Sequence, residues 1–291
     1  MKPTVKLACM SWIYNKHSFE RALESISRAG YRYVSFGLPH EGKPAFDDGL
    51  EGEAERITAL LNKYGLEPVS LVSTDVLHPN QPIERAIQRL EFARALGVEE
   101  LLSLGTTSYK RFPDEPRSDE EMAPINEAFA DKYRRVGEEA GKRGLVVTIK
   151  PHTGNTATAE VIADTLRTIG SPHVKASYDP GNVRFYEGIE PADDFPAIAA
   201  QTISVVAKDH RGARAALDFP IPGEGEANFP AIFATMRETG FTGPVIVERL
   251  DGLNGEFGAD IPVEQLDRRI TEARVNLERM LREAGYVCSV V

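Results

Sequence analysis

Ionisable side chains follow four apolar segments in the second half of the chain. The segments end in Lys150-Pro151-His152, Asp179-Pro180-Gly181-Asn182, Lys208-Asp209-His210 and Glu248-Arg249. Because alternate residues of a strand share a face, Lys150, Asp179 and Glu248 can face one enclosed space. One ammonium and two carboxylates there could hold a substrate oxygen and move a proton at a neighbouring carbon. Each charge alone would be ordinary at a solvated strand end, so it is their recurrence on four successive segments that indicates a site.

These residues are positioned by a repeated alternation of strand and helix patterns. We predict strands at Val5–Met10, Tyr31–Phe36, Pro68–Val72, Glu100–Leu104, Leu145–Lys150, Val174–Asp179, Ile203–Lys208 and Pro244–Glu248. Amphipathic helices are predicted at Phe19–Ala29, Gly52–Tyr64, Pro82–Leu96, Ile125–Arg143, Ala159–Ile169, Asp193–Ala200, Asn228–Thr239 and Val263–Ala284. Ser18 is typical of a helix N-cap, and a glycine follows six of the helical runs, at Gly30, Gly65, Gly97, Gly144, Gly240 and Gly285.

Eight strand-helix units predict an α/β fold, a (β/α)8 TIM barrel. An open doubly wound sheet is the alternative, but no GxGxxG follows the first strand. Because no Pro/Gly/Ser-rich linker divides the chain, we predict a single domain over residues 1–291. A TIM barrel carries its active residues at the carboxyl ends of its strands, where the four charged segments end. Gly105–Glu121, the longest polar insertion, should be a loop over that end.

The composition excludes several other functions. The chain has 34 basic and 44 acidic residues, a formal net charge of -10 and no basic tract, so nucleic acid is not an expected partner. No apolar run approaches the roughly 20 residues of a membrane span, and Lys6 interrupts the start where an export signal would be apolar. Cys9 and Cys288 are far apart and show no CxxC spacing. We therefore expect a cytoplasmic protein without a disulfide framework.

In order and spacing the chain resembles the sugar phosphate isomerase/epimerase group of the xylose isomerase-like TIM barrels. The matching stretches are Pro151-His152-Thr153-Gly154, Tyr178-Asp179-Pro180-Gly181-Asn182, Lys208-Asp209, Gly223–Ile232 and Gly243–Glu248. The resemblance implies a small carbohydrate substrate and favours a homodimer. It also implies a divalent metal ion held by Glu, Asp, His and Glu from strands five to eight. In that family the metal polarises substrate oxygens while the two Glu residues shuttle a proton.

This chain departs from the family's metal ligands at two of four positions. Lys150 stands where the first Glu is expected, and Val206 stands where the His is expected, so only Asp179 and Glu248 remain. Two carboxylates beside an ammonium form a poor site for Mn²⁺ or Zn²⁺. We therefore predict no metal cofactor, with at most weak residual metal binding by Asp179 and Glu248. Three carboxylates and a divalent ion sum to one negative charge, as do Asp179, Glu248 and Lys150. The ammonium could thus replace the charge of the ion, though not its Lewis acidity toward two oxygens.

Three functional hypotheses follow. In the first, a metal-independent isomerase or epimerase moves a proton next to the carbonyl of a sugar, keto-sugar or polyol. Lys150 donates to the developing enolate oxygen, or acts as base if its pKa is lowered, and Glu248 is the second acid/base. In the second, the protein is a lyase that works by elimination or by a Schiff base on Lys150, with Lys208 lowering the pKa of that amine. In the third, the barrel binds sugar without turnover, and Lys150 is merely paired with Glu248.

The remaining candidate residues would bind substrate. His152 and His210 could contact sugar hydroxyls, and Trp12, the single tryptophan, could stack on a sugar ring or serve as a core or rim aromatic. The other predicted substrate-binding residues are Asp179, Lys208 and Arg249.

Overall fold

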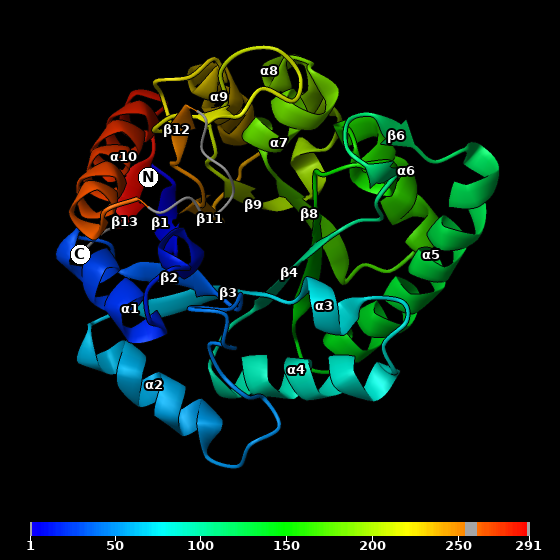
Figure 1. Ribbon diagram of the computed structural model, residues 1–291, viewed down its shortest axis with the longest axis horizontal. Coiled ribbons are helices and arrows are strands. Elements are labelled where there is room, and N and C mark those ends of the chain that lie inside the picture. The colour runs from blue at the N-terminus through cyan, green and yellow to red at the C-terminus, as the bar shows by residue number, and fades with distance from the viewer. Residues whose placement is uncertain (1, 254–260, 290–291) are drawn as a thin grey trace.

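A closed ring of parallel strands forms the centre of the computed structural model, which describes residues 2–253 and 261–289 (Figure 1). Within those residues the ring has eight strands, namely β1 (Thr4–Met10), β2 (Tyr33–Phe36), β3 (Glu67–Val72), β4 (Glu100–Leu104), β7 (Val146–Lys150), β8 (Val174–Tyr178), β9 (Thr202–Val206) and β11 (Pro244–Val247). Pairing of β11 with β1, from Pro244 beside Lys6 to Val247 beside Cys9, closes the ring. The predicted single-domain α/β barrel is therefore confirmed, and each strand boundary lies within two residues of its predicted place.

Helices surround the ring of strands (Figure 1). The longer ones are α1 (Phe19–Arg28), α2 (Glu53–Lys63), α4 (Ile83–Ala95), α5 (Asp119–Gly141), α6 (Ala159–Ile169), α7 (Pro180–Glu187), α9 (Phe229–Glu238) and α10 (Val263–Glu283). Short elements include α3 (Thr74–Leu77), α8 (Pro191–Asp194), a hairpin of β5 (Tyr109–Arg111) with β6 (Glu115–Pro116), the pair β10 (Asp218–Phe219) and β12 (Gly252–Leu253), and β13 (Val287–Ser289) beside β1. None of the helices in the described part of the chain is long and apolar enough to cross a membrane.

The predicted helix ends are largely correct. The Ser18 side chain accepts a hydrogen bond from the Arg21 amide and caps α1, as its position predicts. The six glycines that follow helical runs all have positive φ, between 65° and 89°. A residue with a Cβ would be strained in this conformation, which explains why glycine ends these helices.

Two helical predictions are wrong, and one helix of the barrel's carboxyl end, α7, was missed. α5 begins at Asp119 rather than Ile125, because Ser118 and Glu121 form a reciprocal capping box that starts the helix inside the predicted loop. The segment predicted as a helix at Asp193–Ala200 contains the end of α8 and 3₁₀ turns. The helix α7 was not predicted, because Asp179-Pro180-Gly181 has the composition of a turn. Asp179 instead caps α7 by accepting from the Asn182 amide at 3.0 Å, and Pro180 occupies the first helical position.

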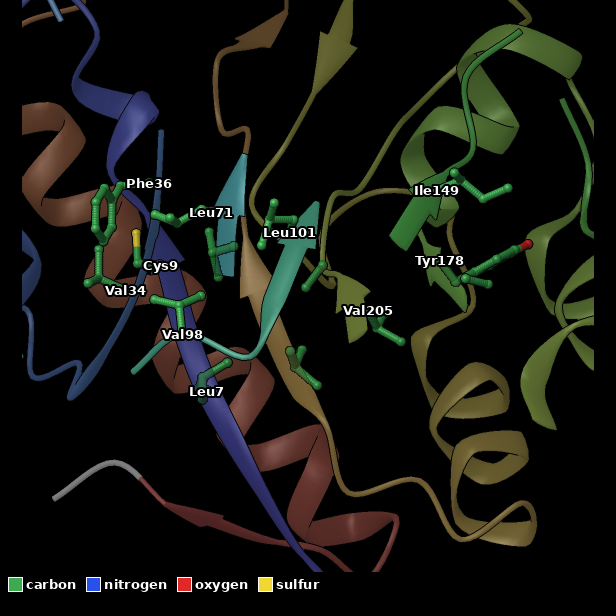
Figure 2. Packing of buried hydrophobic residues seen from close by; sticks show 14 of the residues in the cluster. Leu7, Cys9, Val34, Phe36, Leu71, Val98, Leu101, Ile149, Tyr178 and Val205 are labelled. Atoms are coloured by element: carbon green, nitrogen blue, oxygen red, sulfur yellow. The ribbon is translucent and has the colours of Figure 1, made fainter. Parts of the chain in front are cut away.

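The strands pack apolar side chains on both faces. Outward-facing residues such as Leu7, Cys9, Val34 and Ile149 belong to one large core between the barrel and the helices (Figure 2). A smaller cluster that includes Ala8, Met10, Tyr33, Leu102 and Ile246 fills the barrel interior. Since both faces are buried, the strands are rigid supports for the residues at their ends.

One acid is buried inside the barrel. Glu100 accepts hydrogen bonds from Thr148 at 2.7 Å and Ser204 at 2.6 Å, and Ser204 lies 2.7 Å from Ser177. Burial raises the pKa of Glu100 to about 7, although the two hydroxyl donors oppose the shift. The Glu100 side chain, which lies away from the carboxyl ends of the strands, therefore changes between a neutral carboxyl and a carboxylate near neutral pH.

Candidate active site

Four charged side chains from the last four barrel strands meet at the carboxyl end of the barrel. Lys150 is the last residue of β7, Asp179 follows β8, Lys208 lies two residues beyond β9, and Glu248 follows β11. Lys150 Nζ lies 2.8 Å from Asp179 Oδ2 and 2.7 Å from Glu248 Oε2. Lys208 Nζ lies 2.9 Å and 2.8 Å from the same two oxygens. We call these four residues the ion quartet.

The ion quartet is buried and electrically neutral. Its most exposed member, Glu248, retains 8% of its accessible surface. Burial opposes the charge of Lys150, but Asp179 and Glu248 outweigh burial and raise the pKa of this ammonium. Burial also opposes the charge of Glu248, but Lys150 and Lys208 outweigh it and lower the pKa of this carboxyl. Two ammonium groups therefore face two carboxylates, and the four charges sum to zero.

Two sequence predictions about these charges are wrong. The predicted sum of one negative charge counts Lys150 but not Lys208, which binds the same two carboxylates. The predicted lowering of the Lys150 pKa by Lys208 is also wrong. Both lysines share the carboxylate oxygens, and attraction to these oxygens raises the pKa of Lys150.

Lys208 and Lys150 differ in the oxygens that they contact. Lys208 donates to Asp179 Oδ2 at 2.9 Å and to Asn182 Oδ1 at 2.8 Å, and it forms an ion pair with Glu248 at 2.8 Å. Asn182 is held in turn by donating to the Pro151 carbonyl at 2.7 Å. Lys150 contacts two carboxylates, with both oxygens of Glu248 within 2.9 Å. Each N–H of Lys150 therefore has an acceptor, and a ligand oxygen would have to replace one of the two Glu248 oxygens to bind this ammonium.

A cavity of about 500 Å³ opens onto the ion quartet, and Lys150, Lys208 and Glu248 line it. The structure brings Trp12, His152 and Arg249, all predicted to bind substrate, to the same cavity. Apolar side chains cover other parts of the wall, among them Leu38, Leu102, Phe185, Tyr186 and Leu217. Such a cavity, apolar in its walls with a few polar groups at one place, suits a small organic ligand.

His152 is a neutral imidazole at the edge of this cavity. Its ring packs on Tyr186 at 4.2 Å between centroids. Burial, followed by the charges of Lys150 and Lys208, lowers the pKa of His152 to about 4. At neutral pH the ring therefore offers one donor and one acceptor nitrogen, which is the pattern that pairs with a sugar hydroxyl.

Arg249 is oriented by an aromatic ring and an acid. Its guanidinium lies 3.6 Å from the centroid of the Phe219 ring, and its Nε donates to Asp251. Because stacking and the ion pair fix the side chain, Arg249 presents its charge to the cavity in a defined position.

His210 lies outside the lining of this cavity. It is fully buried, its Nε2 lies 2.7 Å from the Ala216 carbonyl, and its ring packs against Phe185 and Phe219. The neighbouring Asp209 accepts from four backbone amides, those of His210, Gly223, Gly225 and Ala227. These contacts show that the Lys208-Asp209-His210 segment organises the loop before α9 besides presenting Lys208.

The residues at this site do not fit the divalent ion of the family pattern. Asp179 Oδ2 and Glu248 Oε2, which would be its ligands, each lie within 3 Å of two ammonium nitrogens. Val206, at the place of the expected His, is an apolar buried residue. Among the residues that the structure describes, no group of three or more His, Cys, Asp or Glu side chains could hold a metal ion. A cation here would meet two positive charges and too few donors.

Sequence reasoning missed Asn182 and Tyr186 as lining residues. Both belong to α7, the helix that was not predicted, and they are four residues apart and so share a helical face. Recognising Asp179 as an N-cap with proline at the first position would have placed this helix and its face at the site.

The comparisons with known proteins agree with this architecture, a TIM barrel with its candidate site at the carboxyl ends of the strands. The chain belongs to the xylose isomerase-like TIM barrel family, whose model matches residues 23–269. It is 25% identical to the rhizopine catabolism protein MocC of Rhizobium meliloti, over 79% of this chain and 74% of that protein. It is also 25% identical to the inosose dehydratase of Lacticaseibacillus casei, over 79% of this chain and 82% of that enzyme.

Solved structures share the fold at lower identity. A D-allulose 3-epimerase from Methylomonas sp. superimposes with a TM-score of 0.71 at 18% identity, over 97% of this chain and 99% of the epimerase. A xylose isomerase domain protein from Alicyclobacillus acidocaldarius gives 0.72 at 20% identity, over 96% of this chain and 99% of that protein. At these identities the likeness concerns the fold alone.

Proposed function

We propose that this protein is an enzyme of sugar or polyol metabolism that moves a proton at the carbon next to a carbonyl group, without a metal ion. The observation that carries the proposal is the ion quartet at the wall of the 500 Å³ cavity. Its two ammonium groups bring the same positive charge as a divalent ion. They stand beside Glu248, a carboxylate that can accept a proton. Membership of a family of sugar epimerases and isomerases supports a carbohydrate substrate.

The proposed first step forms an enolate. Glu248 takes the proton from the carbon next to the carbonyl, and the C–H electron pair becomes the new carbon–carbon double bond. The carbonyl π pair moves to oxygen, where a Lys150 N–H stabilises the negative charge. Lys208, which contacts both carboxylates, keeps Asp179 and Glu248 in place. In the second step the hydroxyl proton of the deprotonated carbon passes to the enolate oxygen, and the O–H electron pair forms the new carbonyl. The electron pair of the carbon–carbon double bond takes the proton from Glu248 at the former carbonyl carbon, which converts a ketose into an aldose or the reverse.

The contact between Glu248 and Lys150 favours proton transfer on one face of the substrate. Their charged atoms are 2.7 Å apart. A carbon atom needs about 3.5 Å to each neighbouring heavy atom, so no sugar carbon fits between them. Epimerisation by this pair would need the two groups on opposite faces of the carbon. The geometry therefore supports isomerisation more than epimerisation.

Dehydration is a second candidate, because three of the sequence relatives are named inosose dehydratase. It shares the enolate step. The carbonyl then re-forms, the electron pair of the enolate double bond moves to the bond with the next carbon, and the hydroxyl group on that next carbon is expelled. This hydroxyl group takes the proton held by Glu248 and leaves as water. This elimination also takes place on one face. A Schiff base is less well supported, because it needs a neutral amine and the two carboxylates raise the pKa of Lys150.

Deuterium exchange tests the proposal. Protein treated exhaustively with a chelator is incubated in D₂O with a panel of ketohexoses and inososes, and the carbon next to the carbonyl is followed by NMR. We expect deuterium at that carbon, together with an aldose signal for isomerisation or a vinylic signal for dehydration. Glu248→Gln should abolish the exchange. Glu224→Gln, which changes an exposed carboxylate of the loop before α9, should retain it.

Two outcomes would contradict the proposal. Exchange that is lost on chelation and restored by Mn²⁺ would assign the chemistry to a metal. Saturable sugar binding without any exchange would identify the barrel as a sugar-binding protein, the third hypothesis from the sequence.

A further inference from the structure

A second cavity, of about 640 Å³, adjoins the first. The two share Thr74, Leu104 and His152 as lining residues, so they meet at the end of β4. The second cavity lies between α3, the segment that follows β4, and α5, which lie on the same side of the barrel (Figure 1). His152 thus lines both the first cavity, which opens onto the ion quartet, and the second cavity, which does not.

The second cavity, like the first, has a largely apolar wall, but no residue of the ion quartet lines it. Apolar side chains contribute much of its wall, including Leu104, Pro124, Ile125, Ala128 and Phe129. An apolar ring would gain from contact with these side chains. The first cavity alone is large enough for a monosaccharide.

One polar group in the second cavity has no partner. Arg117 lines the cavity, and its Nε is buried without a hydrogen bond to any described residue. Two acids close to it along the chain have other partners, since Glu115 is paired with Arg111 at 3.0 Å and Glu121 with Lys110 at 2.6 Å. An unpaired buried donor is costly unless a ligand oxygen satisfies it. The structure therefore shows a half-buried guanidinium beside an apolar wall, and its Nε has no acceptor among the described residues.

We propose that the second cavity is a subsite for an aromatic substituent of the substrate that bears a carboxylate, with the aromatic ring against α5 and the carboxylate on Arg117. The inference rests on the proposed function, because the sugar part must occupy the first cavity. The natural substrate would then be a sugar or polyol derivative with an aryl acid attached, rather than a free monosaccharide.

Calorimetric binding of three unreactive probes tests this subsite. The probes are methyl β-D-glucopyranoside, phenyl β-D-glucopyranoside and 4-carboxyphenyl β-D-glucopyranoside. Burial of a phenyl ring should make the phenyl probe bind at least about tenfold more tightly than the methyl probe. The carboxyphenyl probe should bind more tightly still, because a charge-assisted hydrogen bond is stronger than a neutral one.

Matched variants locate the effect. Ala128→Trp should fill the cavity and remove the advantage of both aryl probes. Ala123→Trp adds the same side chain at an exposed position of α5 outside the lining and should keep it. Arg117→Met should remove only the advantage of the carboxyphenyl probe over the phenyl probe.

The outcomes separate this inference from the proposed function. Aryl probes that bind no better than the methyl probe, or a binding advantage that survives Ala128→Trp, overturn the subsite. So does an Ala128→Trp variant that changes oligomeric state when Ala123→Trp does not, because the cavity would then belong to a contact between two copies. If the proposed function is wrong but the subsite exists, the protein will catalyse no deuterium exchange and will still bind the aryl probes more tightly than the methyl probe.

Discussion

Replacing Lys150 with methionine should destabilise the protein strongly. The change removes a fully buried ammonium that contacts two carboxylates, at 2.8 Å and 2.7 Å. Lys208 remains between the same acids, but the neutral quartet becomes a buried group with one negative charge. Removing one partner of a buried ion pair typically costs about 3–5 kcal/mol, because the other charge is left uncompensated. We expect a loss of unfolding free energy in that range for Lys150→Met.

A double-mutant cycle isolates the interaction. Glu248→Gln alone leaves one excess positive charge, whereas Lys150→Met with Glu248→Gln restores neutrality. The double variant should therefore be more stable than the sum of the single losses predicts, with a coupling of at least about 2 kcal/mol. Urea unfolding at pH 7 measures all four proteins. The exposed pair Arg32–Glu67, 2.6 Å apart, is the control, and its coupling should be far smaller.

A coupling between Lys150 and Glu248 no larger than that of the control pair would show that the buried charges do not stabilise each other. A Lys150→Met protein with the same unfolding free energy as the wild type would likewise contradict the predicted loss of stability.

Three further predictions concern other buried groups. Because burial raises the pKa of Glu100 from 4.5 to about 7, the folded protein binds a proton more tightly than the unfolded chain, and stability falls as the pH rises through that window. Urea unfolding at pH 5 and pH 8 measures this loss of unfolding free energy, and Glu100→Gln should reduce the difference between the two pH values by about 3 kcal/mol. Glu99→Gln changes an exposed neighbouring residue and should leave the difference as large as in the wild type. The His152 imidazole should titrate in NMR spectra with a midpoint near pH 4, and a midpoint near its ordinary 6.5 would contradict the burial and the lysine charges assigned to it. Asp209→Asn should cost about 1–3 kcal/mol in urea, because its new amide group faces N–H donors of the 223–225 turn, and an unchanged midpoint would be the opposing result.

Most of the fold could be predicted because its signals are local. Apolar segments bounded by glycines mark the strands, and the glycines after α1 and α4 have the positive φ that their positions predict. The errors occur where a cap overrides composition. Ser118 starts α5 before Pro124, and Asp179 starts α7 at a Pro-Gly pair that is typical of turns.

The candidate site could be predicted only in part, because strand parity identifies which residues face inward but not which atoms touch. Parity placed Lys150, Asp179 and Glu248 together, and the structure agrees. Lys208 lies beyond the end of β9, so the two-residue period of a strand does not determine where its nitrogen lies. Its contacts with both carboxylates depend on side-chain reach, and they change the charge of the site from negative to neutral.

In the proposed function, the ammonium groups of Lys150 and Lys208 take the place of a divalent ion. Calorimetric titration of the metal-stripped protein with Mn²⁺ at pH 7 measures whether the site still binds such an ion. Lys150→Glu combined with Val206→His serves as the matched comparison, because it restores the four ligand types of the family pattern. We predict stoichiometric Mn²⁺ binding by that variant and none by the wild type. One equivalent of Mn²⁺ bound by the wild type and lost in Asp179→Asn would contradict the account.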